Sequence, residues 1–225
     1  SSAASDVYKR QAYANIAHIP GADRFVLGWP EKAAAFRDSW PQKELDIAYS
    51  DDPRHCFDLF FPTGQARGLV IFIHGGYWRA FNKDDWSHLA AGALAHGFAV
   101  AVPSYRLAPL VALNEICRDV AAAVKVAADY INGPLHLVGH SAGGHLVTRL
   151  ISGTPLLAPE LIKRIVAVTS ISGVHDLRPL LFTKLNDLLA ITDCIATTES
   201  PTLLMPLPSV RAGQIAVSPV SYTHL

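Results

Sequence analysis

Short apolar runs separated by turn-forming residues dominate the first half of the chain. Residues 44–48 and 56–61 alternate apolar with polar side chains on either side of a Ser-Asp-Asp-Pro sequence, which predicts a β-hairpin. Residues 68–73 and 98–102 are almost continuously apolar, as is typical of strands buried on both faces of a sheet. We therefore expect a sheet that begins with a hairpin and continues with buried strands.

Helical and strand patterns alternate through the rest of the chain. Residues 113–130 place Ile116, Val120 and Val124 on one helical face, and an Asn-Gly stop signal follows. A hairpin followed by strand–helix–strand units predicts one α/β domain, with a mostly parallel sheet and helices on both faces. Shorter patterns predict helices at 86–96 and 143–151 and strands at 135–138, 164–170 and 214–217.

Composition narrows the functional class. The 225 residues are 50% hydrophobic and 17% charged, enough to bury a large core without disulfides or metals. The 19 basic residues balance the 19 acidic ones, which argues against nucleic acid or an anionic membrane as a partner. No apolar run reaches the roughly 18 residues of a membrane span. Cys56, Cys117 and Cys194 lack metal-site spacing, so we expect free thiols, no cofactor and a cytoplasmic protein.

Residues 1–11 and 220–225 differ in character from the segment between them. The first stretch lacks the apolar core of a secretory signal, and the second follows a strand-like stretch. We interpret both as non-native read-through and expect the native domain to span residues 12–217. The alternative is that both are genuine frayed termini.

A G-x-S-x-G pentapeptide, Gly139-His140-Ser141-Ala142-Gly143, joins a predicted strand to a predicted helix. This is the context of a nucleophile elbow, where a sharp turn lifts the serine hydroxyl clear of the sheet edge. Glycines flank the serine because larger side chains would collide with the neighbouring strand or helix. The alternative is an ordinary strand-to-helix turn that contains an incidental serine.

A second glycine-rich turn, His74-Gly75-Gly76-Tyr77-Trp78, directly follows the apolar run at 68–73. Acyl transfer needs backbone N–H donors aimed at the oxygen that becomes anionic, and a glycine-rich turn after the third strand can supply them. The N–H that follows the nucleophile, on Ala142, would supply another. The alternative is a flexible loop whose aromatic residues cap the core.

The chain resembles the kynurenine formamidase (arylformamidase) group of α/β-hydrolases, whose H-G-G-x-W signature matches residues 74–78. The resemblance implies that Ser141 is the nucleophile and that the amides of Gly76, Tyr77 and Ala142 form the oxyanion hole. It also implies that His74 orders the loop and performs no proton chemistry. Supporting stretches are Ala12-Tyr13-Ala14-Asn15, Arg79-Ala80-Phe81, Pro103-Ser104-Tyr105, Gly139–His145 and Ser172–Leu180.

The same resemblance places the catalytic acid after a seventh strand and the catalytic histidine after an eighth. We therefore expect this chain to lack both residues, together with the last strand and helix, and to be inactive by itself. The full-length form would be a serine hydrolase that cleaves an aryl-formamide such as N-formyl-kynurenine, a reaction of tryptophan catabolism. A general carboxylesterase and a non-catalytic binding protein of the same fold stay as alternatives. The expected partner is a small-molecule substrate, and a homodimer stays open.

Other histidines could be taken for triad members. We interpret His145, one turn after Ser141, as a packing residue, and His140 as a lid or packing residue. Asp176, which follows His175 at the catalytic edge of the sheet, is expected to cap the Leu-Arg-Pro segment after it, with a triad role as the alternative. His224 lies in the suspected read-through and receives no role.

Aromatic residues near the second motif leave two interpretations open. Tyr77, Trp78 and Trp86 could stack on a planar substrate, or they could close the upper edge of the core. Cys117 lies within the long predicted helix and is expected to act as a small hydrophobic residue and not as a nucleophile.

Overall fold

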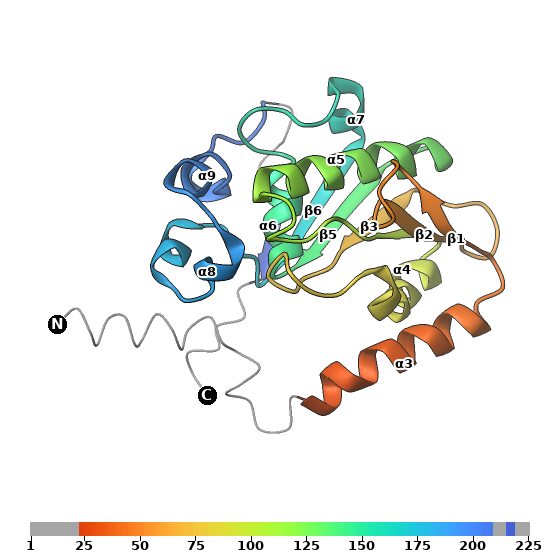
Figure 1. Cartoon of the computed structure of the whole chain (residues 1–225). Helices are drawn as coiled ribbons and strands as arrows, with labels where there is room; N and C mark the ends of the chain where they lie inside the picture. The colour runs from red at the N-terminus through yellow and green to blue at the C-terminus, as the bar shows by residue number, and fades with distance from the viewer. Residues whose placement is uncertain (1–22, 209–214, 219–225) are drawn as a thin grey trace.

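Seven strands form one mixed sheet in the computed structural model, which describes residues 23–208 and 215–218 (Figure 1). Their order across the sheet is β1-β2-β4-β3-β5-β6-β7. The strands are β1 (Lys43–Ala48), β2 (Cys56–Phe60), β3 (Leu69–Ile73), β4 (Ala99–Pro103), β5 (Leu135–His140), β6 (Ile165–Ile171) and β7 (Ile215–Ser218).

Strand direction follows the pattern predicted from the sequence. β1 pairs with β2 in the antiparallel hairpin, and β2 pairs antiparallel with β4. The pairs β3–β4, β3–β5, β5–β6 and β6–β7 are all parallel. The prediction of a mostly parallel sheet that begins with a hairpin is therefore confirmed for the described residues.

Helices cover both faces of this sheet (Figure 1). Leu69, Ile71 and Ile73 of β3 point into the core that contains α5 and α6, whereas Phe72 points into the cluster beneath α4. The described helices are α3 (Asp23–Ser39), α4 (Ala90–Ala95), α5 (Leu113–Tyr130), α6 (Ala142–Arg149), α7 (Pro159–Arg164), α8 (Asn186–Leu189) and α9 (Asp193–Thr198), with 3-10 turns η1 (Lys83–Asp85), η2 (Ser87–Leu89), η3 (Arg178–Phe182) and η4 (Pro201–Leu203).

Helix boundaries differ from the predictions where local backbone geometry intervenes. The long helix at 113–130 is found at its predicted bounds. The segment predicted as one helix at 86–96 consists instead of η2 at 87–89 and α4 at 90–95, and Trp86, with a non-helical φ of −126°, lies before both. α3 was not predicted. It packs through widely spaced aromatic residues, so its amphipathic pattern in the sequence is weak. Trp29 lies against Trp86 with ring centroids 4.7 Å apart, and Phe36 against Phe60 at 5.3 Å.

The parallel register brings the two sequence motifs to the same edge of the sheet. Ile73 of β3 is paired with Gly139 of β5, and His140 of β5 is paired with Ile171 of β6. Because the carboxyl ends of parallel strands meet at one edge, the loops after β3, β5 and β6 lie side by side there. Of the expected domain 12–217, residues 12–22 and 209–214 lie outside the described residues.

Candidate active site

Ser141 occupies a strained turn between β5 and α6. Its φ of 54° and ψ of −116° lie outside the regions that a residue with a side chain ordinarily adopts. Such a conformation costs about 1–3 kcal/mol and persists only where the surroundings enforce it. Here the Ser141 N–H donates to the carbonyl oxygen of Ile171 at 2.8 Å, and α6 begins at the next residue. The turn has the geometry expected of a nucleophile elbow.

Two glycines of the pentapeptide allow the elbow to pack against the sheet. A Cβ atom on Gly139 would lie 2.1 Å from the carbonyl oxygen of Gly143. A Cβ atom on Gly143 would lie 2.0 Å from the carbonyl oxygen of Ile73 in β3. These close approaches explain why the sequence has glycine on both sides of Ser141.

The glycine-rich turn after β3 contacts the elbow directly. A Cβ atom on Gly75 would lie 3.1 Å from the Cβ atom of Ser141 and 2.9 Å from the carbonyl oxygen of His140. The next three residues have positive φ angles, 109° at Gly76, 49° at Tyr77 and 57° at Trp78. The structure therefore brings together the two motifs that the sequence singled out.

Ala142 is the first residue of α6, directly after Ser141. The first N–H groups of a helix have no partner within the helix and carry the positive end of its dipole. The backbone beside the Ser141 hydroxyl is thus suited to an anionic oxygen.

His74 is completely buried at the base of the glycine-rich turn. Its Nδ1 donates to the carbonyl oxygen of Gly75 at 2.7 Å, and its ring stacks on Tyr105 with centroids 4.3 Å apart. Burial lowers the pKa of His74 to about 4, so its imidazole is neutral at physiological pH. The predicted ordering role of His74 fits these contacts.

Tyr105, quoted above only as part of the family resemblance, also holds this turn. Its hydroxyl donates to the carbonyl oxygen of His74 at 2.9 Å, and Ala108 donates to the carbonyl oxygen of Trp78 at 2.8 Å. The Arg54 guanidinium donates to the carbonyl oxygens of Phe81 at 2.6 Å and Tyr105 at 2.7 Å. The residue pattern gave no signal for these contacts, because they join loops that are distant in sequence.

His145 and His175 are both engaged away from Ser141. His145 is fully buried, donates from Nε2 to the carbonyl oxygen of Glu199 at 2.7 Å and meets Trp78 edge to face. Its interpretation as a packing residue is confirmed. Both ring nitrogens of His175 form hydrogen bonds of 3.1 Å, one with Ser170 and one with Thr148.

The remaining candidates have local roles. Asp176 accepts from the backbone N–H of Arg178, the first residue of η3, and forms an ion pair with the Arg178 side chain. The N-cap of η3 is nevertheless Leu177, with no side-chain capping bond, so the prediction that Asp176 is the N-cap is wrong by one position, and Asp176 makes only a local turn contact with Arg178. His140 is half-buried and packs against Gly75, while His224 lies outside the described residues.

Burial separates the two interpretations of the aromatic residues. Trp78 is 0% and Trp86 6% exposed, so both belong to the core and are not available to stack on a substrate. Tyr77 is half-buried beside the glycine-rich turn. Cys117 is buried in α5, and burial raises the pKa of its thiol, which confirms it as a small hydrophobic residue.

Neither a metal site nor a membrane-spanning helix is found in the part of the chain that the structure describes. No group of three or more His, Cys, Asp or Glu side chains there could hold a metal ion. None of the helices within 23–208 is both long and apolar enough to cross a membrane.

Curated relatives include kynurenine formamidases from fish. The chain is 30% identical to the enzyme of Danio rerio over 183 residues, which is 79% of this chain and 61% of that protein. It is 31% identical to the enzyme of Salmo salar over 171 residues, which is 73% of this chain and 57% of that protein. The chain thus spans about three fifths of the length of these relatives.

The chain is also similar to a solved structure, and it matches the sequence profile of a protein family. A crystal structure of a proposed thioesterase from Silicibacter sp. TM1040 is 43% identical, with a TM-score of 0.84, and the match covers 92% of this chain and 79% of that one. The sequence profile of the alpha/beta hydrolase family matches residues 70–219, two thirds of the chain. The chain therefore belongs to the alpha/beta hydrolase family.

Proposed function

We propose that this protein is a serine hydrolase that cleaves an aryl-formamide such as N-formyl-kynurenine. The observation that carries the proposal is the contact between a strained Ser141 at the elbow and the glycine-rich turn after β3. That arrangement supports Ser141 as the nucleophile and the amides of Gly76, Tyr77 and Ala142 as the oxyanion hole.

In the proposed reaction, the Ser141 hydroxyl attacks the formamide carbonyl and gives its proton to a histidine base. The carbonyl oxygen becomes anionic and faces the three backbone amides, whose positions need no rearrangement at that moment. The C–N bond then breaks, and the histidine returns the proton to the leaving aryl amine. Water attacks the formyl-serine ester and releases formate, which restores the hydroxyl.

The base itself is not among the residues brought to Ser141. Within residues 23–208 and 215–218, no hydrogen bond joins the Ser141 hydroxyl to an imidazole, and His145 and His175 are both engaged elsewhere. The described residues do not include the acid and histidine that the family resemblance expects after the seventh and eighth strands. We therefore propose that the 225-residue chain alone is essentially inactive, because a serine without a base is a weak nucleophile.

A second candidate function is hydrolysis of an ester or thioester. It is favoured by the 43% identity to the proposed thioesterase, which exceeds the 30% identity to the Danio rerio kynurenine formamidase. The same serine and amides would serve both reactions, so only the pocket would decide between them.

Three substrates distinguish these candidates: N-formyl-kynurenine, p-nitrophenyl acetate and a short-chain acyl thioester. We would assay the 225-residue chain and the protein expressed from its native gene side by side. The proposal expects the highest kcat/KM for N-formyl-kynurenine. A preference of more than about tenfold, or 1.4 kcal/mol, for an ester or thioester would establish the second candidate instead.

Removing the Tyr105 hydroxyl tests the support of the glycine-rich turn. Tyr105→Phe loses one buried hydrogen bond to the His74 carbonyl, so we expect a free energy of unfolding lower by about 1–2 kcal/mol and kcat lower by several-fold. Urea denaturation and steady-state kinetics measure these effects. Tyr130→Phe, at an exposed tyrosine of α5, is the matched control. Unchanged stability and kcat in Tyr105→Phe would contradict this role.

A further inference from the structure

The segment between His74 and Lys83 is held in a conformation that its own residues do not favour. Besides Tyr77 and Trp78, Phe81 also has a positive φ, of 72°. Each non-glycine residue in the left-handed region costs about 1–2 kcal/mol. Contacts from outside the segment must therefore fix its path.

Lys83 ends this segment as a buried cation among three carboxylates. Its side chain is 5% exposed, and its Nζ lies 2.7 Å from Asp46, 2.9 Å from Asp58 and 2.8 Å from Asp84. Its backbone N–H donates to the Ser104 hydroxyl at 2.9 Å, one residue before Tyr105. Lys83 thus touches the hairpin, its own 3-10 turn and the segment that follows β4.

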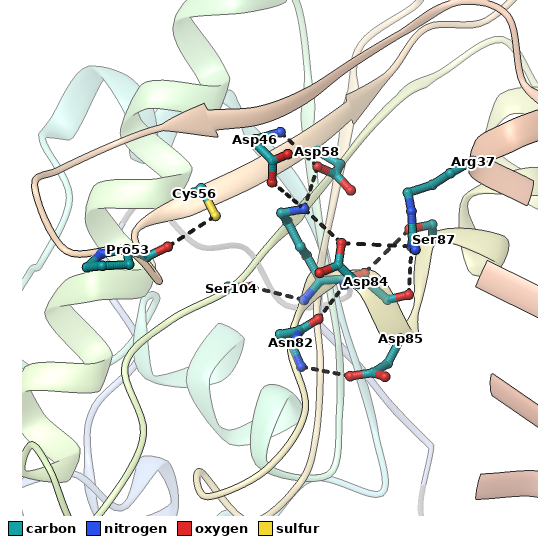
Figure 2. Close-up of polar contacts among 11 residues, drawn as sticks. Arg37, Asp46, Pro53, Cys56, Asp58, Asn82, Asp84, Asp85, Ser87 and Ser104 are labelled. Carbon is teal, nitrogen blue, oxygen red and sulfur yellow. Dashed lines mark hydrogen bonds and ion pairs between the residues drawn. The ribbon is translucent and has the colours of Figure 1, made fainter. Parts of the chain in front are cut away.

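Figure 2 shows Asp46 and Asp58, from the β1–β2 hairpin, converging with Asp84 from η1. On the outer side, the Arg37 guanidinium of α3 donates to the Asp84 carbonyl oxygen at 2.6 Å and to the Ser87 hydroxyl at 2.8 Å. The cluster therefore joins the edge of the sheet and α3 to the chain that leaves the glycine-rich turn.

The charges make Lys83 difficult to replace. Burial alone lowers the pKa of Lys83, but the hydrogen bonds that its ammonium donates to Asp46, Asp84 and Asp58 outweigh this effect and raise the pKa above its ordinary value. Burial raises the pKa of Asp58, against hydrogen bonds from the Asp46 amide and Lys83. The Asp58 Oδ2 atom has no hydrogen-bond partner among the described residues, so this carboxylate depends on the contacts of its other oxygen. Lys83 is charged at physiological pH and is not a nucleophile.

We infer that Lys83 is a positioning residue for the oxyanion hole, and that its ion pairs with the β1–β2 hairpin fix the path of residues 76–82 beside Ser141. This inference rests on the proposed function, because it assigns the support of the same site. Lys83 acts from outside the site: it anchors the end of the segment, while Tyr105 and His74 anchor its start.

The test compares four variants. Lys83→Met removes the ammonium. The double variant Lys83→Met/Asp58→Asn also removes the buried negative charge that Lys83 would leave unpaired. The double variant should therefore stay folded even if the single variant does not. Lys83→Arg retains the charge and is the rescue. Lys125→Met replaces an exposed lysine of α5 and is the control.

Two measurements separate positioning from stability. Hydrogen–deuterium exchange of the 225-residue chain follows the amides of residues 76–82, with those of α5 as an internal reference. Steady-state kinetics of the protein expressed from its native gene give kcat and KM separately. We expect exchange in residues 76–82 to rise at least about tenfold with α5 unchanged, and kcat to fall about 10- to 100-fold with KM within threefold, because a displaced oxyanion donor acts on the transition state. Lys83→Arg is expected to restore most of both.

Equal acceleration of exchange in α5 and in residues 76–82 would show only global destabilisation and would overturn the inference. Unchanged exchange and kcat in the folded variants would overturn it as well. Full activity of a Ser141→Ala variant would instead refute the proposed function, whatever Lys83 does. The two failures are therefore distinguishable.

Discussion

Replacing Ser141 with alanine is expected to lower kcat by roughly 10⁴- to 10⁶-fold, because removal of a catalytic nucleophile leaves only binding and oxyanion stabilisation. Alanine meets the same backbone strain as serine at φ 54°, and the Ser141 hydroxyl makes no hydrogen bond among the described residues. The melting temperature should therefore change little. Steady-state kinetics and thermal denaturation, each on the unsubstituted protein and on Ser141→Ala expressed from the native gene, measure the two effects.

Ser39→Ala is the matched control, since Ser39 is exposed at the end of α3 and its hydroxyl donates to the Phe36 carbonyl, its one side-chain hydrogen bond among the described residues. A serine-directed phosphonate adds an independent readout, because it should modify Ser141 in the active protein and leave Ser39 unlabelled. Residual activity above about 1% in Ser141→Ala would exclude Ser141 as the nucleophile. Labelling of another serine would then identify its replacement.

The elbow and the glycine-rich turn could be predicted because their constraints are local in sequence. A strand followed by glycine, serine and glycine at alternate positions is enough to indicate a sharp turn, and the β3–β5 register then brings His74 and Ser141 to one edge. Strands buried on both faces were recognisable for the same reason, from uninterrupted apolar runs.

The supports of the site could not be predicted, because they join positions far apart in sequence. Lys83 meets Asp46 and Asp58 across 37 and 25 positions, and Tyr105 meets His74 across 31. In the sequence, Asp46 and Asp58 are only polar positions of the predicted hairpin, and no pattern pairs them with Lys83 or pairs Tyr105 with His74. Only the folded sheet, with β2 next to β4, places them together.

Replacing Gly143 with alanine is expected to destabilise the fold by more than about 4 kcal/mol, an effect as large as the most disruptive core substitutions. The new Cβ atom would lie 2.0 Å from the carbonyl oxygen of Ile73 and 2.7 Å from that of His74. Both are backbone atoms at the end of β3, so no side chain can rotate away, and α6 must separate from the sheet. Alanine favours a helix over glycine by about 1 kcal/mol, which is too little to compensate.

The chain offers a matched control in Gly92, which lies near the start of α4 as Gly143 lies near the start of α6. A Cβ atom on Gly92 meets nothing within 4 Å, so Gly92→Ala should keep or raise the midpoint of urea unfolding through helix propensity alone. Gly143→Ala should instead give little soluble protein or an early unfolding midpoint. Any folded remainder should have lost activity, because movement of α6 carries Ala142 and Ser141 away from the glycine-rich turn. Equal midpoints for the two variants would show that α6 does not need to approach β3 this closely, and that close packing of the elbow is not what fixes Ser141.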